Sequence, residues 1–177
     1  RFAGVDIILG PEMKSTGEVM GMDHELGIAY MKAQEAASHF LPTRGKVFIS
    51  VKDSDKRAVV SIGQRLEMLG FEIVATSGTA RVLQRNGVHV REIPKLKEGR
   101  PNPLDLIING ELSLIINTPS GKGPKTDEAK IRTAAVAHGV TVITTIQGAA
   151  MAVNGIAAVK RRSPEVQAVQ DYHTGLV

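Results

Sequence analysis

Between residues 46 and 156, short apolar runs alternate with segments in which apolar residues recur at helical spacing. Five runs have the length of buried strands: Lys46–Val51, Phe71–Ala75, Val88–Ile93, Leu112–Asn117 and Thr141–Thr145. Strands that alternate with helices specify a parallel sheet with helices on both faces. The sequence therefore predicts an α/β fold, a doubly wound five-stranded parallel sheet.

The segments between these runs predict the helices. They are a helix capped by Asp53 or Ser54 and closed by Gly70, a short helix from Ala80 to Gly87, one or two turns over 104–109, a helix from Thr126 or Asp127 to Gly139, and an Ala-rich helix over 146–156. The spacing of apolar residues in 159–177 predicts neither a helix nor a strand.

The N-terminal part of the chain has a different pattern. Residues 1–23 are Gly-rich and loop-like, apolar spacing predicts a helix over 25–38, and 40–45 with Pro42 has the composition of a linker. We expect residues 1–40 to be the tail of a preceding domain and 41–177 to form the second domain. Since the chain starts without Met, we expect it to be part of a longer protein.

Composition narrows the function classes. The 177 residues include no Cys, which removes disulfides, thiolate zinc sites and cysteine nucleophiles. Aromatic residues make up 3% and the net charge is +4, without a long basic run, so nucleic-acid binding is not expected. The five histidines lack metal-ligand spacing, and no apolar stretch has the length of a membrane span. The expected setting is cytoplasmic, with no metal site and no membrane contact.

The turn after the second strand carries the clearest chemistry. Thr76, Ser77, Gly78 and Thr79 follow a buried strand and open a helix, where unpaired backbone N–H groups and the helix dipole favour an anion. The alternative is that Ser77 or Thr79 only caps the helix.

The loops after parallel strands gather along one edge of a sheet, so distant residues can share a site. Eleven residues with hydroxyl, amide or ammonium groups follow the five strands: Ser50, Lys56, Thr76, Ser77, Thr79, Lys95, Asn117, Thr118, Ser120, Lys122 and Thr144. Carboxylates are missing from the ends of strands two to four, although Asp53, Asp55 and Asp127 stand nearby, and no Ser-His-Asp set can be argued. These donors and cations predict an anion site, with phosphate as the expected anion.

Several stretches carry a family resemblance. Residues 10–21, Gly-Pro-Glu-Met-Lys-Ser-Thr-Gly-Glu-Val-Met-Gly, resemble the end of the second ATP-grasp half of carbamoyl phosphate synthetase large subunits. Residues 45–157 resemble the C-terminal regulatory domain of those subunits, which has the methylglyoxal-synthase-like fold. The motifs are 50–56 (Ser-Val-Lys-Asp-Ser-Asp-Lys), 75–80 (Ala-Thr-Ser-Gly-Thr-Ala), Lys95 with 98–101 (Glu-Gly-Arg-Pro), and 115–121 (Ile-Ile-Asn-Thr-Pro-Ser-Gly).

The resemblance implies an allosteric domain without catalysis of its own. It implies an effector such as UMP, IMP or N-acetylglutamate. It places the effector phosphate at four residues, Lys56, Thr76, Thr79 and Lys95, and a contributor to an ornithine site at Thr144. The full-length enzyme would use ATP with Mg²⁺ or Mn²⁺ and a glutamine amidotransferase small subunit, and it would form a homo-oligomer through this domain.

Two alternatives remain open. One is a structural or oligomerisation module of the same subunit. The other is a phosphate-eliminating lyase like methylglyoxal synthase, whose catalytic carboxylates come from a Gly-Gly-Asp loop and a Trp-Asp-Pro strand end. The matching places here read Glu-Gly-Arg-Pro and Asn-Thr-Pro, which disfavours the lyase.

Overall fold

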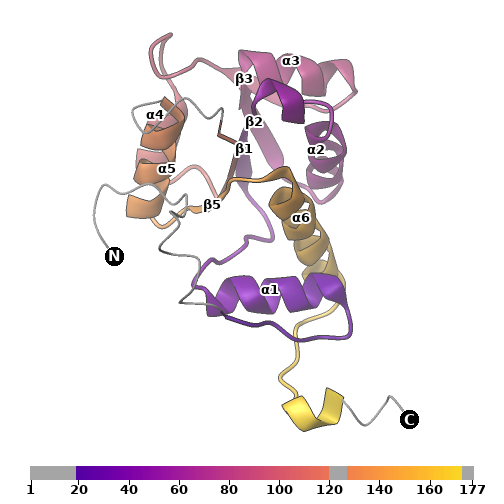
Figure 1. Cartoon of the computed structure of the whole chain (residues 1–177). Coiled ribbons are helices and arrows are strands. Elements are labelled where there is room, and N and C mark those ends of the chain that lie inside the picture. Colours follow the sequence, from indigo (N-terminus) through magenta and orange to yellow (C-terminus); the bar gives the residue numbers. More distant parts are fainter. Residues whose placement is uncertain (1–18, 120–126, 173–177) are drawn as a thin grey trace.

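A single parallel sheet forms the centre of the molecule in a computed structural model, which describes residues 19–119 and 127–172 (Figure 1). Its strands lie in the order β3-β2-β1-β4-β5 and all neighbours pair in parallel. Their bounds are β1 (Lys46–Ser50), β2 (Glu72–Thr76), β3 (Val90–Ile93), β4 (Leu114–Asn117) and β5 (Thr141–Ile143). The predicted five-stranded α/β sheet is confirmed.

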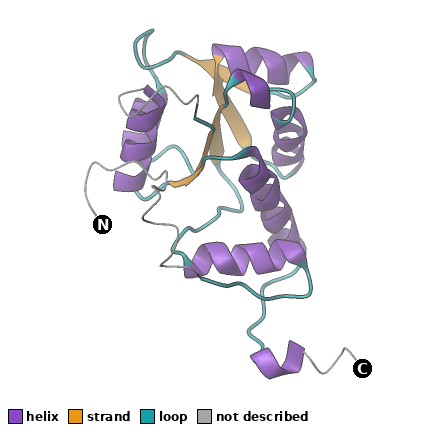
Figure 2. Cartoon of the chain, in the orientation of Figure 1, coloured by secondary structure: helices purple, strands orange, loops and turns teal. Residues whose placement is uncertain are grey.

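Helices cover both faces of the sheet (Figure 2). One face packs against α2 (Val59–Met68), α3 (Ser77–Arg85) and α6 (Ile146–Arg161), and the other against α4 (Pro103–Ile108) and α5 (Asp127–Ala137). Successive side chains of β1 point to opposite faces of the sheet, so each face has its own hydrophobic core. Val47 and Ile49 belong to the core under α2, α3 and α6, Phe48 belongs to the core under α4 and α5, and all three are fully buried. The doubly wound arrangement is therefore confirmed as well.

The turn after β1 differs from the prediction. Asp53 and Ser54 do not cap α2. They belong to a separate 3₁₀ turn, η2 (Asp53–Asp55), and α2 begins only at Val59 after Ala58. Asp and Ser favour such turns over helix interiors, because their side chains offer the backbone local hydrogen bonds. The consequence is a tight turn that presents Lys56 at the edge of the sheet.

Helix α6 also differs, since it continues five residues beyond the predicted end at Ile156. Its C-terminal part packs against α1 (Leu26–Ala36), the helix expected over 25–38. The two helices approach closely through glycines: a Cβ on Gly27 would lie 2.9 Å from the Asn154 carbonyl oxygen, and one on Gly155 would lie 2.8 Å from Met31. Packing against α1 thus stabilises α6 beyond the residue at which the spacing of apolar residues predicted its end.

Residues near both ends of the described chain meet beside α1. Asp23 pairs with Lys32 (2.9 Å) and Arg162 (2.7 Å), and the Tyr172 hydroxyl, in η3 (Val169–Tyr172), donates to the Met22 carbonyl oxygen (2.9 Å). The predicted domain boundary at residue 40 stays a prediction. Most of the predicted loop-like segment of the tail, residues 1–18, lies outside the described residues.

Candidate anion-binding pocket

A cavity of about 800 Å³ opens at the carboxyl ends of β1 and β2. In open parallel sheets this edge holds ligands, at the place where the strand order reverses. Here the reversal lies between β1 and β4, where Ser50 and Asn117 are register partners. The cavity, called the anion pocket below, is lined by Ser50, Val51, Lys52, Asp53, Lys56, Thr76, Ser77, Gly78, Thr79, Lys95, Leu96, Lys97, Pro103, Asp127, Glu128 and Ile131.

The start of α3 forms one wall of this pocket. Thr76 is the N-cap residue, and its side chain makes no capping hydrogen bond among the described residues. Ser77 and Thr79 lie inside the helix, so the alternative that either one caps it is wrong. The Thr79 hydroxyl accepts from the Val51 backbone N–H (3.3 Å), and the hydroxyls of Ser50 and Thr76 lie 3.4 Å apart. These hydroxyls join the loop after β1 to α3 and leave the positive end of the helix facing the pocket.

Two predicted lysines enter from neighbouring loops. The Lys56 ammonium lies 3.1 Å from the position that a Cβ on Gly78 would take, so it lies over the first turn of α3. It pairs with Asp53 at 2.6 Å, while Lys95 pairs with Glu98 at 3.2 Å. A cation over a helix N-terminus is electrostatically favoured only with a negative group beside it. Asp53 supplies that charge here, and a bound anion would supply it equally.

Behind the pocket, polar groups hold the loop after β1. The Asn117 amide nitrogen donates to the Ser50 carbonyl oxygen (3.2 Å), and the Lys52 backbone N–H donates to the Thr118 hydroxyl (3.0 Å). Arg132 of α5, 2% exposed, donates to the Asn117 amide oxygen (2.9 Å). Because Arg has no acceptor, this contact fixes which end of the amide faces Ser50. Asn117 and Thr118 therefore shape the pocket from behind without lining it.

The remaining predicted residues fall elsewhere. Ser120 and Lys122 lie outside the described residues. Thr144 follows β5, two strands away from β1, and does not line the pocket. Its neighbour Thr145 caps α6 by accepting from the Gly148 backbone N–H (3.0 Å). The implied ornithine contact at Thr144 stays a prediction.

Sequence reasoning missed several pocket residues. Glu128 is one of them, and it lines the pocket together with Asp53 and Asp127, the two carboxylates that the sequence placed near the strand ends. Glu98 lies in the loop after β3. Asp127 and Glu128 form the first turn of α5, a helix whose approach to β1 depends on the fold. For Lys52 and Lys97 the signal was present, since both stand in loops that follow strands of the same edge.

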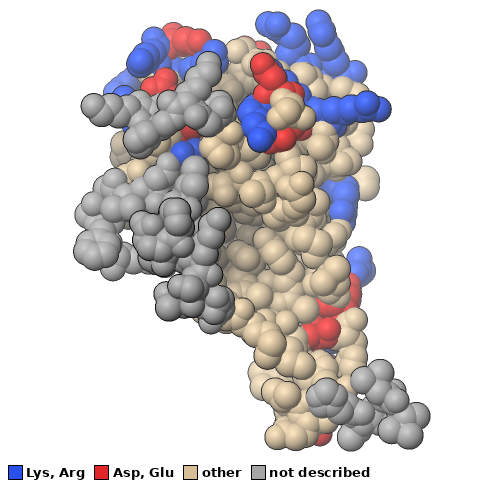
Figure 3. All heavy atoms as spheres, viewed as in Figure 1, with Lys and Arg blue, Asp and Glu red and all other residues tan. Residues whose placement is uncertain are grey.

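The pocket end of the molecule is rich in mixed charge. Lys and Arg side chains gather at the top of the space-filling view, with Asp and Glu among them (Figure 3). Within residues 19–119 and 127–172, no group of three or more His, Asp or Glu side chains could hold a metal ion. Nor is any helix of these residues long and apolar enough to cross a membrane.

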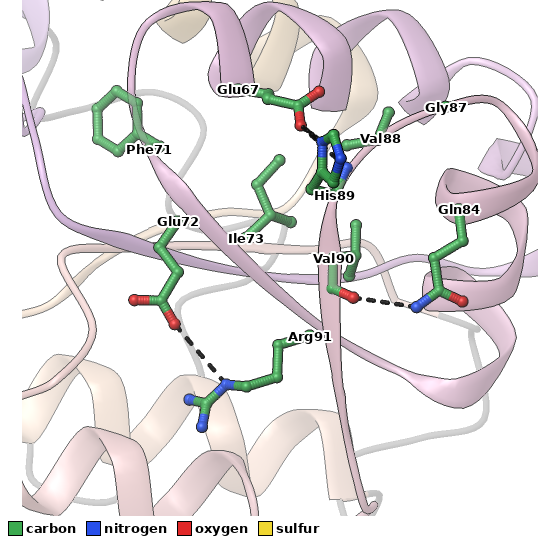
Figure 4. A pocket seen from close by; sticks show the side chains of 10 residues that line it. All are labelled: Glu67, Phe71, Glu72, Ile73, Gln84, Gly87, Val88, His89, Val90 and Arg91. Atoms are coloured by element: carbon green, nitrogen blue, oxygen red, sulfur yellow. Dashed lines mark hydrogen bonds and ion pairs between the residues drawn. The ribbon is translucent and has the colours of Figure 1, made fainter.

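A second cavity, of about 640 Å³, lies at the amino ends of β2 and β3 (Figure 4). Phe71, Ile73 and Val88 contribute its apolar surface. Polar groups at its rim pair with one another: Glu67 with His89, Glu72 with Arg91 at 3.7 Å, and the Gln84 amide nitrogen with the Val90 carbonyl oxygen at 3.0 Å. We call this cavity the amino-end groove.

Comparison with known proteins relates the fold to a family. Residues 58–144 match the family model described as MGS-like domain. This part of the chain is an MGS-like domain. It contains Thr76, Thr79, Lys95 and Asn117, whereas Ser50 and Lys56 precede the matched range.

Curated relatives extend the similarity beyond the MGS-like domain. The carbamoyl phosphate synthase large chain of Archaeoglobus fulgidus is 51% identical over 174 residues, covering 98% of this chain and 16% of that protein. The C-terminal section of the Aquifex aeolicus large chain is 50% identical over 165 residues, covering 93% of this chain and 31% of that protein. The arginine-specific, chloroplastic large chain of Oryza sativa is 46% identical over 173 residues, covering 97% and 15%. The resemblance drawn from the motifs is confirmed, and the chain spans a minor part of each relative's length.

Proposed function

We propose that this chain is the effector-binding regulatory part of a carbamoyl phosphate synthase large chain. The anion pocket would bind the phosphate group of an effector of the UMP or IMP type. The observation that carries the proposal is the start of α3, which faces the cavity without a side-chain cap from Thr76 and with the Lys56 ammonium above it. Backbone N–H groups, hydroxyls and ammonium groups together form a typical phosphate site.

Each pocket residue has a distinct task in this proposal. Backbone N–H groups at Gly78 and Thr79 would donate to phosphate oxygens, and Lys56 and Lys95 would neutralise its charge from two loops. Thr79 and Ser50 would keep the loop after β1 in place. Asn117 would do so from behind, itself oriented by Arg132.

In the full-length protein, the pocket would modulate ATP- and glutamine-dependent carbamoyl phosphate synthesis. The proposed enzyme is a ligase that uses ATP with Mg²⁺ or Mn²⁺ and works with a glutamine amidotransferase small subunit. The names of the relatives support the assignment to carbamoyl phosphate synthase. An effector that favours one arrangement of this domain against its neighbour shifts activity by a coupling of about 1–3 kcal/mol. Self-association through this domain, and a cytoplasmic location, are further predictions.

Calorimetric titration of the 177-residue chain tests the proposal. UMP, IMP, N-acetylglutamate and ornithine are titrated into the wild-type chain, Lys56→Ala and Thr79→Ala. Arg91→Ala at the amino-end groove is the matched control, because it also removes one exposed cation. We expect saturable nucleotide binding that weakens at least about tenfold in both pocket variants and is unchanged in the control. Equal binding by all four proteins, or no nucleotide binding, would contradict the proposal.

A further inference from the structure

The outer sides of α2 and α3 carry positive charge without acidic neighbours. Arg57, two residues before α2, and Arg81 and Arg85 of α3 are exposed, and their side chains have no hydrogen-bond or ion-pair partner among the described residues. The exposed residues of 57–68 and 77–86 include no Asp, Glu or Lys. Lys and Arg side chains project from the upper right of Figure 3, where α2 and α3 lie in Figure 1. We call the surface formed by these three arginines and the exposed Met68 the arginine face.

Helices α2 and α3 are in contact, so their exposed sides form one surface. The Gln64 amide nitrogen donates to the Asn86 carbonyl oxygen (3.1 Å), and a Cβ on Gly63 would lie 2.8 Å from the Leu83 side chain. The one carboxylate of the two helices, Glu67, pairs with His89 at the amino-end groove. The arginines of this surface therefore have no counter-charge within it.

The stability of the fold does not explain this arrangement. Arg81 and Arg85 are four residues apart on one helix, where like charges repel each other. Arg57 precedes the start of α2, where the helix dipole disfavours a cation. Only Arg85, in the last turn of α3, has a position that the dipole favours. A binding role accounts for the other two arginines.

The composition of the arginine face indicates the kind of partner. Arg and Met are enriched at protein interfaces, whereas Lys is depleted, and Met68 of this face is 79% exposed. A guanidinium group binds a carboxylate through two parallel hydrogen bonds. Residues 57–68 and 77–86 include no aromatic side chain on which a nucleic-acid base could stack. These features fit an acidic protein surface better than a nucleic acid.

We propose that the arginine face is a docking surface for an acidic protein surface. Arg57, Arg81 and Arg85 would pair with clustered Asp or Glu side chains, and Met68 would contact an apolar part of the same partner. Within residues 19–119 and 127–172, no three His, Asp or Glu side chains gather closely enough to hold a metal ion, so the described part of a second copy offers no tight acidic cluster. The three arginines do not line the anion pocket, so this inference does not rest on the proposed function.

Fluorescence anisotropy with a labelled deca-glutamate peptide tests the inference. The measurement uses the 177-residue chain at low ionic strength, where surface charges are least screened. The variants are Arg81→Gln/Arg85→Gln and the triple variant that adds Arg57→Gln. Arg44→Gln/Arg91→Gln is the matched control, because it removes two exposed arginines outside this face. A labelled thymidine decanucleotide is the second probe, and Lys56→Ala reports on binding in the anion pocket.

We expect the wild-type chain to bind deca-glutamate more tightly than the decanucleotide. The affinity for the peptide should fall about fivefold in the double variant and at least about tenfold in the triple variant, and by less than about twofold in the control. Melting temperatures should stay equal among all these chains, because exposed substitutions of this kind scarcely change stability.

Several results would overturn the inference. Wild type may not bind the peptide, or the triple variant may bind it as tightly as wild type does. The control may lose as much affinity as the double variant, which would reduce the effect to net charge. Tighter binding of the decanucleotide would favour a nucleic acid as the partner. Peptide binding that needs Lys56 but not the arginines would place the peptide in the anion pocket. None of these results changes the nucleotide titration that tests the proposed function.

Discussion

The sheet carries a cavity at each end of β2, and the two cavities differ in what their polar groups do. In the amino-end groove, Glu67 pairs with His89 and Glu72 with Arg91 around an apolar surface. In the anion pocket, a helix start without a cap from Thr76 faces the cavity beside Lys56. Size does not distinguish them. Donors directed into a cavity therefore define a binding site better than the cavity's shape does.

The largest expected difference between the two ends comes from a matched pair of arginine substitutions. Arg132→Met removes a buried guanidinium behind the anion pocket, leaves Asn117 without its donor, and should lower the free energy of unfolding by about 2–4 kcal/mol. Arg91→Met at the groove removes a half-exposed partner of Glu72 and should change the free energy of unfolding by less than about 0.5 kcal/mol. Urea unfolding measures both. Equal losses of unfolding free energy would contradict the expected difference between the polar contacts at the two ends of the sheet.

Unfolding at acid pH distinguishes a buried carboxylate, such as Asp23, from the exposed carboxylates around the two cavities. Burial alone would raise the pKa of Asp23, but the Glu25 backbone N–H, Lys32 and Arg162 lower it to about 2. A lowered pKa stabilises the fold above the ordinary Asp value of 3.8, and the contribution is lost as the pH falls from about 4 to 2. Asp23→Asn should therefore cost about 1–2 kcal/mol at pH 7 and almost nothing at pH 2. A pH-independent cost would contradict this assignment.

A pair of glycine substitutions separates binding from folding. A Cβ on Gly78 would meet only the flexible end of Lys56, at 3.1 Å, so Gly78→Ala should leave the melting temperature unchanged or higher while weakening phosphate binding about three- to tenfold. Gly87 lines the groove with φ +79° and open space around it, so Gly87→Ala should cost about 1 kcal/mol of stability without changing binding. The reverse pattern would place the ligand in the groove.

The smallest effect is expected from Glu67→Gln at the groove. The His89 backbone N–H, and then its ring, lower the pKa of Glu67, so the pair stabilises the fold above the ordinary Glu value of 4.5 and loses this contribution below it. The melting temperature of the variant should be slightly lower than that of wild type at pH 7 and equal to it at pH 3. Its affinity for phosphate should equal that of wild type. Altered phosphate binding would mean that the groove takes part in the site.

The strands and the pocket edge were predictable because both depend on local patterns. Five apolar runs identify the strands, and parallel pairing brings their carboxyl ends together regardless of the conformation of the loops. Arg132 was not predictable, since a single basic residue in a helical segment is usually exposed and its contact with Asn117 exists only in the folded chain. The approach of Glu128 to the pocket and the extra length of α6 likewise depend on tertiary packing.

The most direct test is a crystal structure of the chain with UMP or IMP bound. We expect phosphate oxygens about 3 Å from the backbone nitrogens of Gly78 and Thr79 and from the Lys56 ammonium. A nucleotide in the groove beside Phe71 and His89, or a phosphate that makes no contact with α3 or Lys56, would contradict it.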